Sequence, residues 1–137
     1  MSVFLDSNFF LYAYSKNQGA KEAFAKKRLR EFWEDKEQPS LSIQVLQEVH
    51  FNLVKFGYPA QDSWELLRRY LAWPLVENTR DILALAMETQ IKYQISFWDA
   101  SIIAAAKAAG ACELWTEDLN TGQDYGGLVV VNPFDLT

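Results

Sequence analysis

The chain has 137 residues, of which 50% are hydrophobic and 15% aromatic, and its formal net charge is −5 at pH 7. This length and apolar content favour one folded domain, spanning residues 1–137 around a single core, over a disordered chain. The net negative charge argues against a protein that coats nucleic acid nonspecifically. A local basic face is still compatible with it, because ten of the 13 Lys and Arg residues lie within residues 1–70.

The first half of the chain alternates short strands with helices. Short apolar runs indicate the strands, and apolar residues that recur near helical spacing indicate the helices. Gly57 and Pro59 end the last of these helices. The predicted elements are a strand at Val3–Leu5, helices at Asn8–Tyr14 and Gly19–Trp33, a strand at Leu41–Ile43 and a helix through Val45–Val54.

The second half continues the same alternation, and Thr79 and Ser96 are suitable N-caps for two of its helices. The pattern predicts an α/β domain around a mostly parallel sheet, in which ligands bind beyond the carboxyl ends of the strands. The predicted elements are a helix at Asp62–Ala72, a strand at Pro74–Val76, helices from Thr79 to Tyr93 and from Ser96 to Gly110, and strands at Glu113–Trp115 and Leu128–Val131.

Four acids lie early in segments that leave the same edge of this predicted sheet. Asp6 ends the first strand, and Glu48 lies about one turn into the helix after the second strand. Asp99 lies in the first turn of the alanine-rich helix, and Asp118 follows the Glu113–Trp115 strand. Four converging carboxylates would repel one another and raise one another's pKa unless a cation neutralised them. Hard oxygen ligands of this kind suit Mg²⁺ or Mn²⁺.

Each acid also has an ordinary structural explanation. Asp6 could cap the helix that follows it, and Asp99 stands three residues after Ser96, where the acid of a capping box would lie. Glu48 could face solvent, and Asp118 could belong to a turn. The joint arrangement, and no single acid, therefore carries the prediction of a site.

Several segments resemble the motifs of PIN-domain ribonucleases. In that family an acid closes the first strand and is followed by a small hydroxyl residue and Asn, a second acid lies on the helix after strand two, and a third opens a helix of small and aliphatic residues. The segments that carry the resemblance are LDSNFFLYAY from Leu5, Leu46–Glu48, FWDASIIAAA from Phe97, Trp115–Leu119 with Gly122 and Gln123, and Val131–Phe134.

This resemblance covers nearly the whole chain, with the order and spacing of the motifs preserved. It implies an α/β/α sandwich with a five-stranded parallel sheet in the order 3-2-1-4-5, and a metal-dependent endonuclease that acts on RNA. Small stand-alone members are commonly toxins of a toxin–antitoxin pair, of the VapC type, and are usually homodimers. The resemblance therefore also implies an antitoxin partner.

Carried over position by position, the resemblance assigns site residues in this chain. Glu117 and Asp124 compete with Asp118 for the role of the last acid. The implied site acids and metal ligands are Asp6, Glu48, Asp99 and Asp118, and the implied supporting residues are Ser7, Asn8 and Thr116.

The implied chemistry needs no side-chain nucleophile. Mg²⁺ or Mn²⁺ held by Asp6, Asp99 and Asp118 would lower the pKa of a bound water and polarise the scissile phosphate. Glu48 would hold a second ion or orient that water, and the sequence does not decide between one ion and two. The products would carry a 5′-phosphate and a 3′-hydroxyl. Such hydrolysis does not require the 2′-hydroxyl of RNA.

The densest basic patch lies on the predicted second helix. Its members are Lys26, Lys27, Arg28 and Arg30. The patch is either a solvated helix face balanced by neighbouring acids or a surface that contacts the phosphate backbone of RNA.

Two other functions compete with the ribonuclease. A phosphatase with an aspartate nucleophile requires an Asp-x-Asp pair, and Asn8 occupies its second position. A non-catalytic module with the same fold could bind a protein or RNA, although the four acids argue against it. His50 is the only histidine, and we expect it to have a structural or surface role and no catalytic one.

Composition also bears on where the protein acts. Cys112 is the only cysteine, so an intrachain disulfide and a cysteine-rich zinc site are excluded. The sequence lacks a basic N-terminal segment that leads into a long apolar stretch, and no apolar run approaches 18 residues. We therefore expect a cytoplasmic protein without a secretion signal or a membrane span.

Overall fold

Parallel strands form the centre of the fold in a computed structural model, which describes residues 2–17 and 19–136. One sheet contains β1 (Val3–Leu5), β4 (Glu113–Trp115) and β5 (Val129–Val131) in the order β1-β4-β5, with both pairs parallel. A second parallel pair joins β2 (Leu41–Ser42) to β3 (Leu75–Val76). The α/β class and the parallel pairing predicted from the sequence are confirmed.

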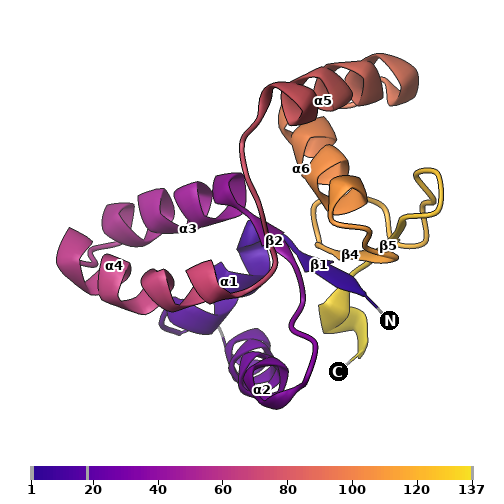
Figure 1. Cartoon of the computed structure of the whole chain (residues 1–137). Helices are drawn as coiled ribbons and strands as arrows, with labels where there is room; N and C mark the ends of the chain where they lie inside the picture. The colour runs from indigo at the N-terminus through magenta and orange to yellow at the C-terminus, as the bar shows by residue number, and fades with distance from the viewer. Residues whose placement is uncertain (1, 18, 137) are drawn as a thin grey trace.

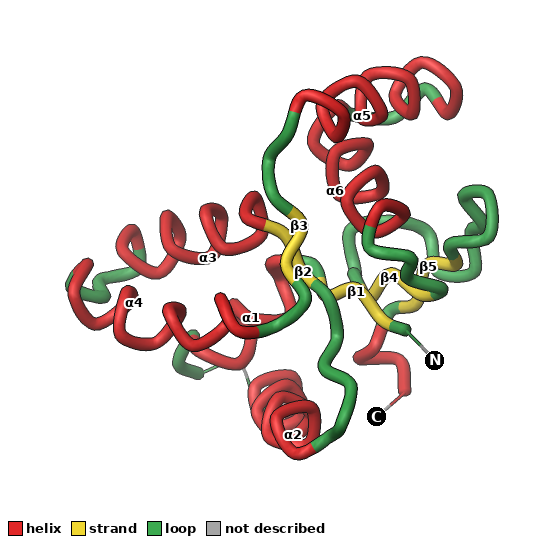
Figure 2. The backbone as a smooth tube through the Cα atoms, in the orientation of Figure 1, coloured by secondary structure: helices red, strands yellow, loops and turns green. Residues whose placement is uncertain are grey.

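The single five-stranded sheet expected from the resemblance is not formed. An isolated parallel bridge between Phe4 and Ser40 connects the two sheets, and Figure 2 shows the strands following one another as β3, β2, β1, β4 and β5. The second sheet is short because Ser42 is both the last residue of β2 and the N-cap of the next helix, where its hydroxyl accepts a hydrogen bond from the Val45 N–H at 3.2 Å. Ile43, predicted to be in the strand, therefore begins the helix.

The helices surround these strands (Figure 1), with α3 and α4 to the left of them and α5 and α6 above. The helix predicted over Asp62–Ala72 is divided into an α-helical part and a 3₁₀ part. Among the described residues, no helix combines the length and the apolar character needed to cross a bilayer. The helices are α1 (Ser7–Tyr14), α2 (Ala20–Glu34), α3 (Ile43–Lys55), α4 (Ala60–Leu67), α5 (Arg80–Tyr93) and α6 (Phe97–Ala108), with 3₁₀ turns η1 (Arg68–Ala72) and η2 (Pro133–Leu136).

Buried aromatic side chains fix the start of α1 against the end of the sheet. The ring of Phe9 is fully buried and lies 5.8 Å from that of Trp115 in β4 and 5.9 Å from that of Phe134 in η2. Burial of an aromatic side chain of this size contributes about 1.5–3 kcal/mol. The polar residues that precede and follow these anchors are thereby held at the carboxyl ends of β1 and β4.

Candidate active site at the carboxyl ends of the strands

Asp6 lies directly after β1 and is the N-cap of α1. Its Oδ1 accepts a hydrogen bond from the Ser7 N–H at 2.7 Å, and its Oδ2 accepts one from the Thr116 hydroxyl at 2.9 Å. Only 6% of the residue is exposed. The capping explanation for Asp6 is therefore correct, and the same geometry holds a buried carboxyl group at the edge of the sheet.

The protonation of Asp6 is strongly perturbed. Desolvation by burial is the main cause that raises its pKa, from 3.8 to about 7, and the charges of Glu48 and Asp118 raise it further. The hydrogen bonds from Ser7 and Thr116 oppose this effect. In the described part of the chain, no Lys or Arg is within ion-pair distance of Asp6.

Glu48 reaches the same place from α3. Its Oε2 accepts a hydrogen bond from the Ser7 hydroxyl at 2.9 Å, and its Oε1 accepts one from the Gln44 amide at 2.8 Å. Ser7 thus connects the two acids, because its backbone N–H donates to Asp6 and its hydroxyl donates to Glu48. Gln44 is not part of any of the predicted motifs. It lies one helical turn before Glu48 on α3, and that spacing is the only signal in the sequence that indicates it.

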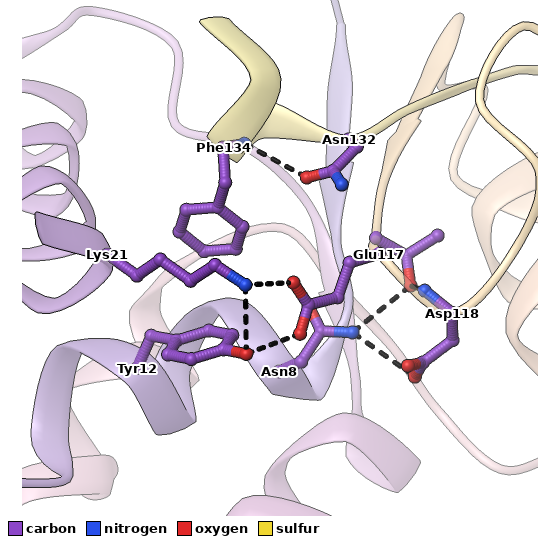
Figure 3. A network of polar contacts seen from close by, with 8 residues as sticks. Asn8, Tyr12, Lys21, Glu117, Asp118, Asn132 and Phe134 are labelled. Atoms are coloured by element: carbon purple, nitrogen blue, oxygen red, sulfur yellow. Dashed lines mark hydrogen bonds and ion pairs between the residues drawn. The ribbon is translucent and has the colours of Figure 1, made fainter. Parts of the chain in front are cut away.

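Asp118 comes from the turn after β4 and faces α1 (Figure 3). The Asn8 amide N–H₂ donates to the Thr116 hydroxyl and to Asp118 Oδ2, each at 3.2 Å. The Thr116 hydroxyl also accepts the Asp118 N–H at 3.1 Å. Asn8 Oδ1 is buried and has no hydrogen-bond partner among the residues that the structure describes. Asn8 and Thr116 therefore lie at this site together with Asp6 and Asp118.

Glu117 and Asp124, which compete with Asp118 for the role of the last site acid, form hydrogen bonds with residues outside the site. Glu117 accepts hydrogen bonds from the Tyr12 hydroxyl at 2.5 Å and from Lys21 Nζ at 2.9 Å. Asp124 accepts the Gly127 N–H at 2.7 Å within its own turn. Asp118, by contrast, raises the pKa of Asp6 through its charge.

Asp99 lies apart from this group in its contacts. Its backbone N–H donates to the Ser96 hydroxyl at 3.1 Å, as expected for the N-terminus of α6. Its charge acts on Tyr125, whose pKa is raised mainly by burial and then by Asp99 and Tyr93. The structure therefore brings Asp6, Glu48 and Asp118 into electrostatic contact, whereas Asp99 interacts with other groups.

The donor atoms fit a hard divalent cation. Mg²⁺ prefers oxygen ligands of the types present here, namely the carboxylate oxygens of Asp6, Glu48 and Asp118 and the amide oxygen of Asn8. It usually keeps several waters in addition. Within residues 2–17 and 19–136, no three His, Cys, Asp or Glu side chains are already close enough to hold an ion. The described residues thus provide oxygen ligands of the right type for a metal site, but their side chains are not yet gathered around one point.

The basic patch on α2 is partly neutralised. Lys26 Nζ lies 2.5 Å from Glu22 Oε2, and an Arg28 nitrogen lies 3.0 Å from Glu31 Oε1. Lys27 and Arg30 are exposed. For Lys26 and Arg28 the structure therefore shows the first of the two alternatives, a helix face on which neighbouring acids balance the basic side chains.

His50 has a structural role, which is one of the two roles that we expected for it. Its Nδ1 lies 2.8 Å from the Ser63 hydroxyl, which joins α3 to α4. The side chain is part of this helix pair, and no contact in the described residues connects it to Asp6.

Comparison with known proteins gives the same fold. The sequence matches no curated protein. A toxin–antitoxin complex from Klebsiella pneumoniae is 20% identical, with a TM-score of 0.69 over 93% of this chain and 96% of that chain. VapC20 from Mycobacterium tuberculosis, described as a toxin that cleaves the sarcin–ricin loop, is 22% identical, with a TM-score of 0.66 over 85% and 92%. VapBC2 from Rickettsia felis, solved with a DNA fragment from its promoter, is 18% identical, with a TM-score of 0.68 over 95% and 97%.

These likenesses concern the fold, since each of these structures is less than 25% identical to the chain. The family itself follows from the sequence match. Residues 3–122, which include all four predicted site acids, match the PIN domain model, and the chain therefore belongs to the PIN domain family.

Proposed function

We propose that this PIN domain is a Mg²⁺- or Mn²⁺-dependent endoribonuclease, acting in the cytoplasm as the toxin of a toxin–antitoxin pair, with residues 1–137 as one domain. One observation carries the proposal. Asp6 is a buried carboxyl group at the carboxyl end of β1, electrostatically coupled to Glu48 and Asp118, and has no cationic side chain as an ion-pair partner in the described residues. Such a group is stabilised in its charged form when a cation binds.

The residues of the chain would prepare this site before the substrate arrives. Two fixed donors, the Ser7 N–H and the Thr116 hydroxyl, hold the Asp6 carboxylate, so that little reorganisation is needed during the reaction. Ser7 and Gln44 hold Glu48 in the same way. A divalent ion at Asp6, Glu48 and Asp118 would supply a Lewis acid for the scissile phosphate and a water of lowered pKa. We propose Asp99 as the fourth acid, from the first turn of α6.

The substrate and the protein partner follow from the same proposal. We propose that Lys27 and Arg30, which are exposed on α2, contact the RNA backbone together with Lys26 and Arg28. Related structures were solved as a toxin–antitoxin complex and as VapBC2, which supports a cognate antitoxin as the partner of this chain.

Cleavage assays with the purified protein test this function. We expect RNA to be cleaved in Mg²⁺ or Mn²⁺ and to remain intact in EDTA, with products that carry a 5′-phosphate. A substrate with a single 2′-deoxy nucleotide at the cleavage site should be cut as well, because an attacking water does not need the 2′-hydroxyl. Release of phosphate from small monoesters would instead indicate the phosphatase. Absence of any cleavage by the folded protein would indicate the binding module.

We further propose that the protein is a homodimer, with α5 in the interface. Leu83, Met87 and Ile91 are 48%, 50% and 77% exposed, and their spacing of four residues places them on one face of α5. Trp98, at 66% exposure, lines a groove with Leu83 next to this face. A second copy of the chain would bury this apolar stripe on both protomers through the same surface, as a two-fold interface does.

Replacing Met87 by Glu is expected to convert the dimer into a monomer, because it places a charge in the centre of the apolar stripe. The measurement is the molar mass by light scattering during gel filtration. Glu88→Gln, which lies beside the stripe, should leave the mass unchanged. A wild-type protein that is monomeric at all concentrations would contradict the proposed interface.

A further inference from the structure

Glu117 is held by donors from two different helices (Figure 3). Its two carboxylate oxygens accept hydrogen bonds from the Tyr12 hydroxyl in α1 at 2.5 Å and from Lys21 Nζ in α2 at 2.9 Å. Lys21 Nζ also contacts the Tyr12 hydroxyl at 3.3 Å and lies 4.8 Å from the centre of the Tyr12 ring. We call this group of Tyr12, Lys21 and Glu117 the Glu117 clamp.

The clamp packs on aromatic side chains. Lys21 Nζ lies 5.4 Å from the centre of the Phe134 ring, and the Tyr12 and Phe134 rings meet edge to face at 4.9 Å. Phe134 is buried and stacks on Phe9 in the core. The clamp therefore rests on the packed interior and does not consist only of a surface ion pair.

The clamp lies within the segment that supplies two site residues. Thr116 and Asp118 flank Glu117, and both accept hydrogen bonds from Asn8. Asn8 and Tyr12 are one turn apart on α1 and so lie on the same face of that helix. The turn after β4 is thus hydrogen-bonded to α1 at two points. Asn8 donates to Thr116 and Asp118, and Tyr12 donates to Glu117.

The charges of the clamp residues favour a structural role over metal binding. The hydrogen bond to Glu117 is the largest cause that raises the pKa of Tyr12 and of Lys21, so both donors retain their protons near neutral pH. The Glu117 carboxylate is already neutralised by Lys21. A carboxylate with these partners is poorly suited to be a metal ligand, in contrast to Asp118, which has no ion pair in the described residues.

We propose that Glu117 is a positioning residue, which through Tyr12 and Lys21 fixes the turn 116–118 so that the Thr116 hydroxyl faces Asp6 and the Asp118 carboxylate faces Asn8. This inference rests on the proposed nuclease function for its kinetic consequences. Its structural content, the fixing of the turn, does not depend on that function.

Three single variants and a matched control test the clamp. Tyr12→Phe removes one hydroxyl without a change of charge, Lys21→Met removes the ammonium group, and Glu117→Ala removes the carboxylate. Glu65→Ala is the control, because it removes the ion pair between Glu65 in α4 and Arg68 in η1, and Glu65 has no contact with the clamp among the described residues. None of the four variants changes a fully buried side chain, and the clamp ion pair is itself only partly buried, so all four variants should fold.

We expect each clamp variant to lower kcat for RNA by about tenfold, because a small displacement of a site residue is costly, while KM changes by less than about twofold. The dissociation constant for Mn²⁺, measured by calorimetry without RNA, should rise. Tyr12→Phe combined with Glu117→Ala should be no worse than Glu117→Ala alone, because the residues act as a unit. Glu65→Ala should match the wild type in all three measurements.

Hydrogen exchange provides a readout that does not depend on nuclease activity. The Asp118 N–H is bonded to the Thr116 hydroxyl, so exchange of residues 116–120 should accelerate in the clamp variants and remain unchanged in Glu65→Ala. Accelerated exchange in a protein without nuclease activity would support the clamp and refute the proposed function. Unchanged exchange in Glu117→Ala, or a rise in KM at constant kcat, would overturn the clamp.

Discussion

Replacing Asp6 by Asn is expected to reduce RNA cleavage by about three orders of magnitude. A bound metal supplies several kcal/mol of transition-state stabilisation, and each ~1.4 kcal/mol corresponds to a factor of ten in rate. The amide oxygen of Asn can still accept the capping hydrogen bond from the Ser7 N–H, and Asn is itself a favoured N-cap, so the local fold should survive although the bond that the Thr116 hydroxyl donates to Asp6 Oδ2 is lost. The measurement is kcat/KM for a defined RNA at saturating Mg²⁺.

The matched control for this variant is Asp124→Asn. Asp124 bonds the Gly127 N–H in a turn and makes no contact with Asp6 among the described residues. Its replacement should leave cleavage unchanged, since it removes the same charge from the chain without touching the site. Equal activity of Asp6→Asn and the wild type would show that the acids at the strand ends do not form the active site.

The local features of the fold could be predicted from the sequence because they depend on near neighbours. The apolar run Val3–Leu5 followed directly by Asp6 specifies a buried strand, an N-cap and a helix within a few residues. Thr79 and Ser96 cap their helices as predicted. The boundary at Ile43 was wrong because Ile suits both strands and helices, and the capping bond of Ser42 decided between them.

The candidate site could be predicted only in part, because its contacts join distant segments. The sequence predicts Asp6, Glu48 and Asp118 as site residues because they stand at strand ends or early in a helix. The role of Glu117 cannot be predicted in this way, since it depends on Tyr12 and Lys21, which are 105 and 96 residues away in the sequence. The interactions of Asp99 likewise depend on the loop that carries Tyr125.

The stability of the metal-free protein is expected to fall as the pH rises from about 4 to about 7. The pKa of Asp6 is raised from 3.8 to about 7 in the folded state, mainly by burial. Between these values the folded protein retains a proton that the unfolded chain has lost, so raising the pH favours unfolding. The shift corresponds to roughly 4 kcal/mol in the free energy of unfolding, fully present below pH 4 and lost above pH 7.

Urea unfolding at a series of pH values, in EDTA and in Mg²⁺, measures this effect. Mg²⁺ should restore stability at pH 8, because an ion that binds the ionised acids binds only the folded state. Asp6→Asn in EDTA should lose the part of the pH dependence that Asp6 causes and should be more stable than the wild type at pH 8, since it carries no charge at this buried position. A wild-type stability that is constant or rises over this pH range would show that the Asp6 carboxyl group ionises as readily in the folded protein as in the unfolded chain.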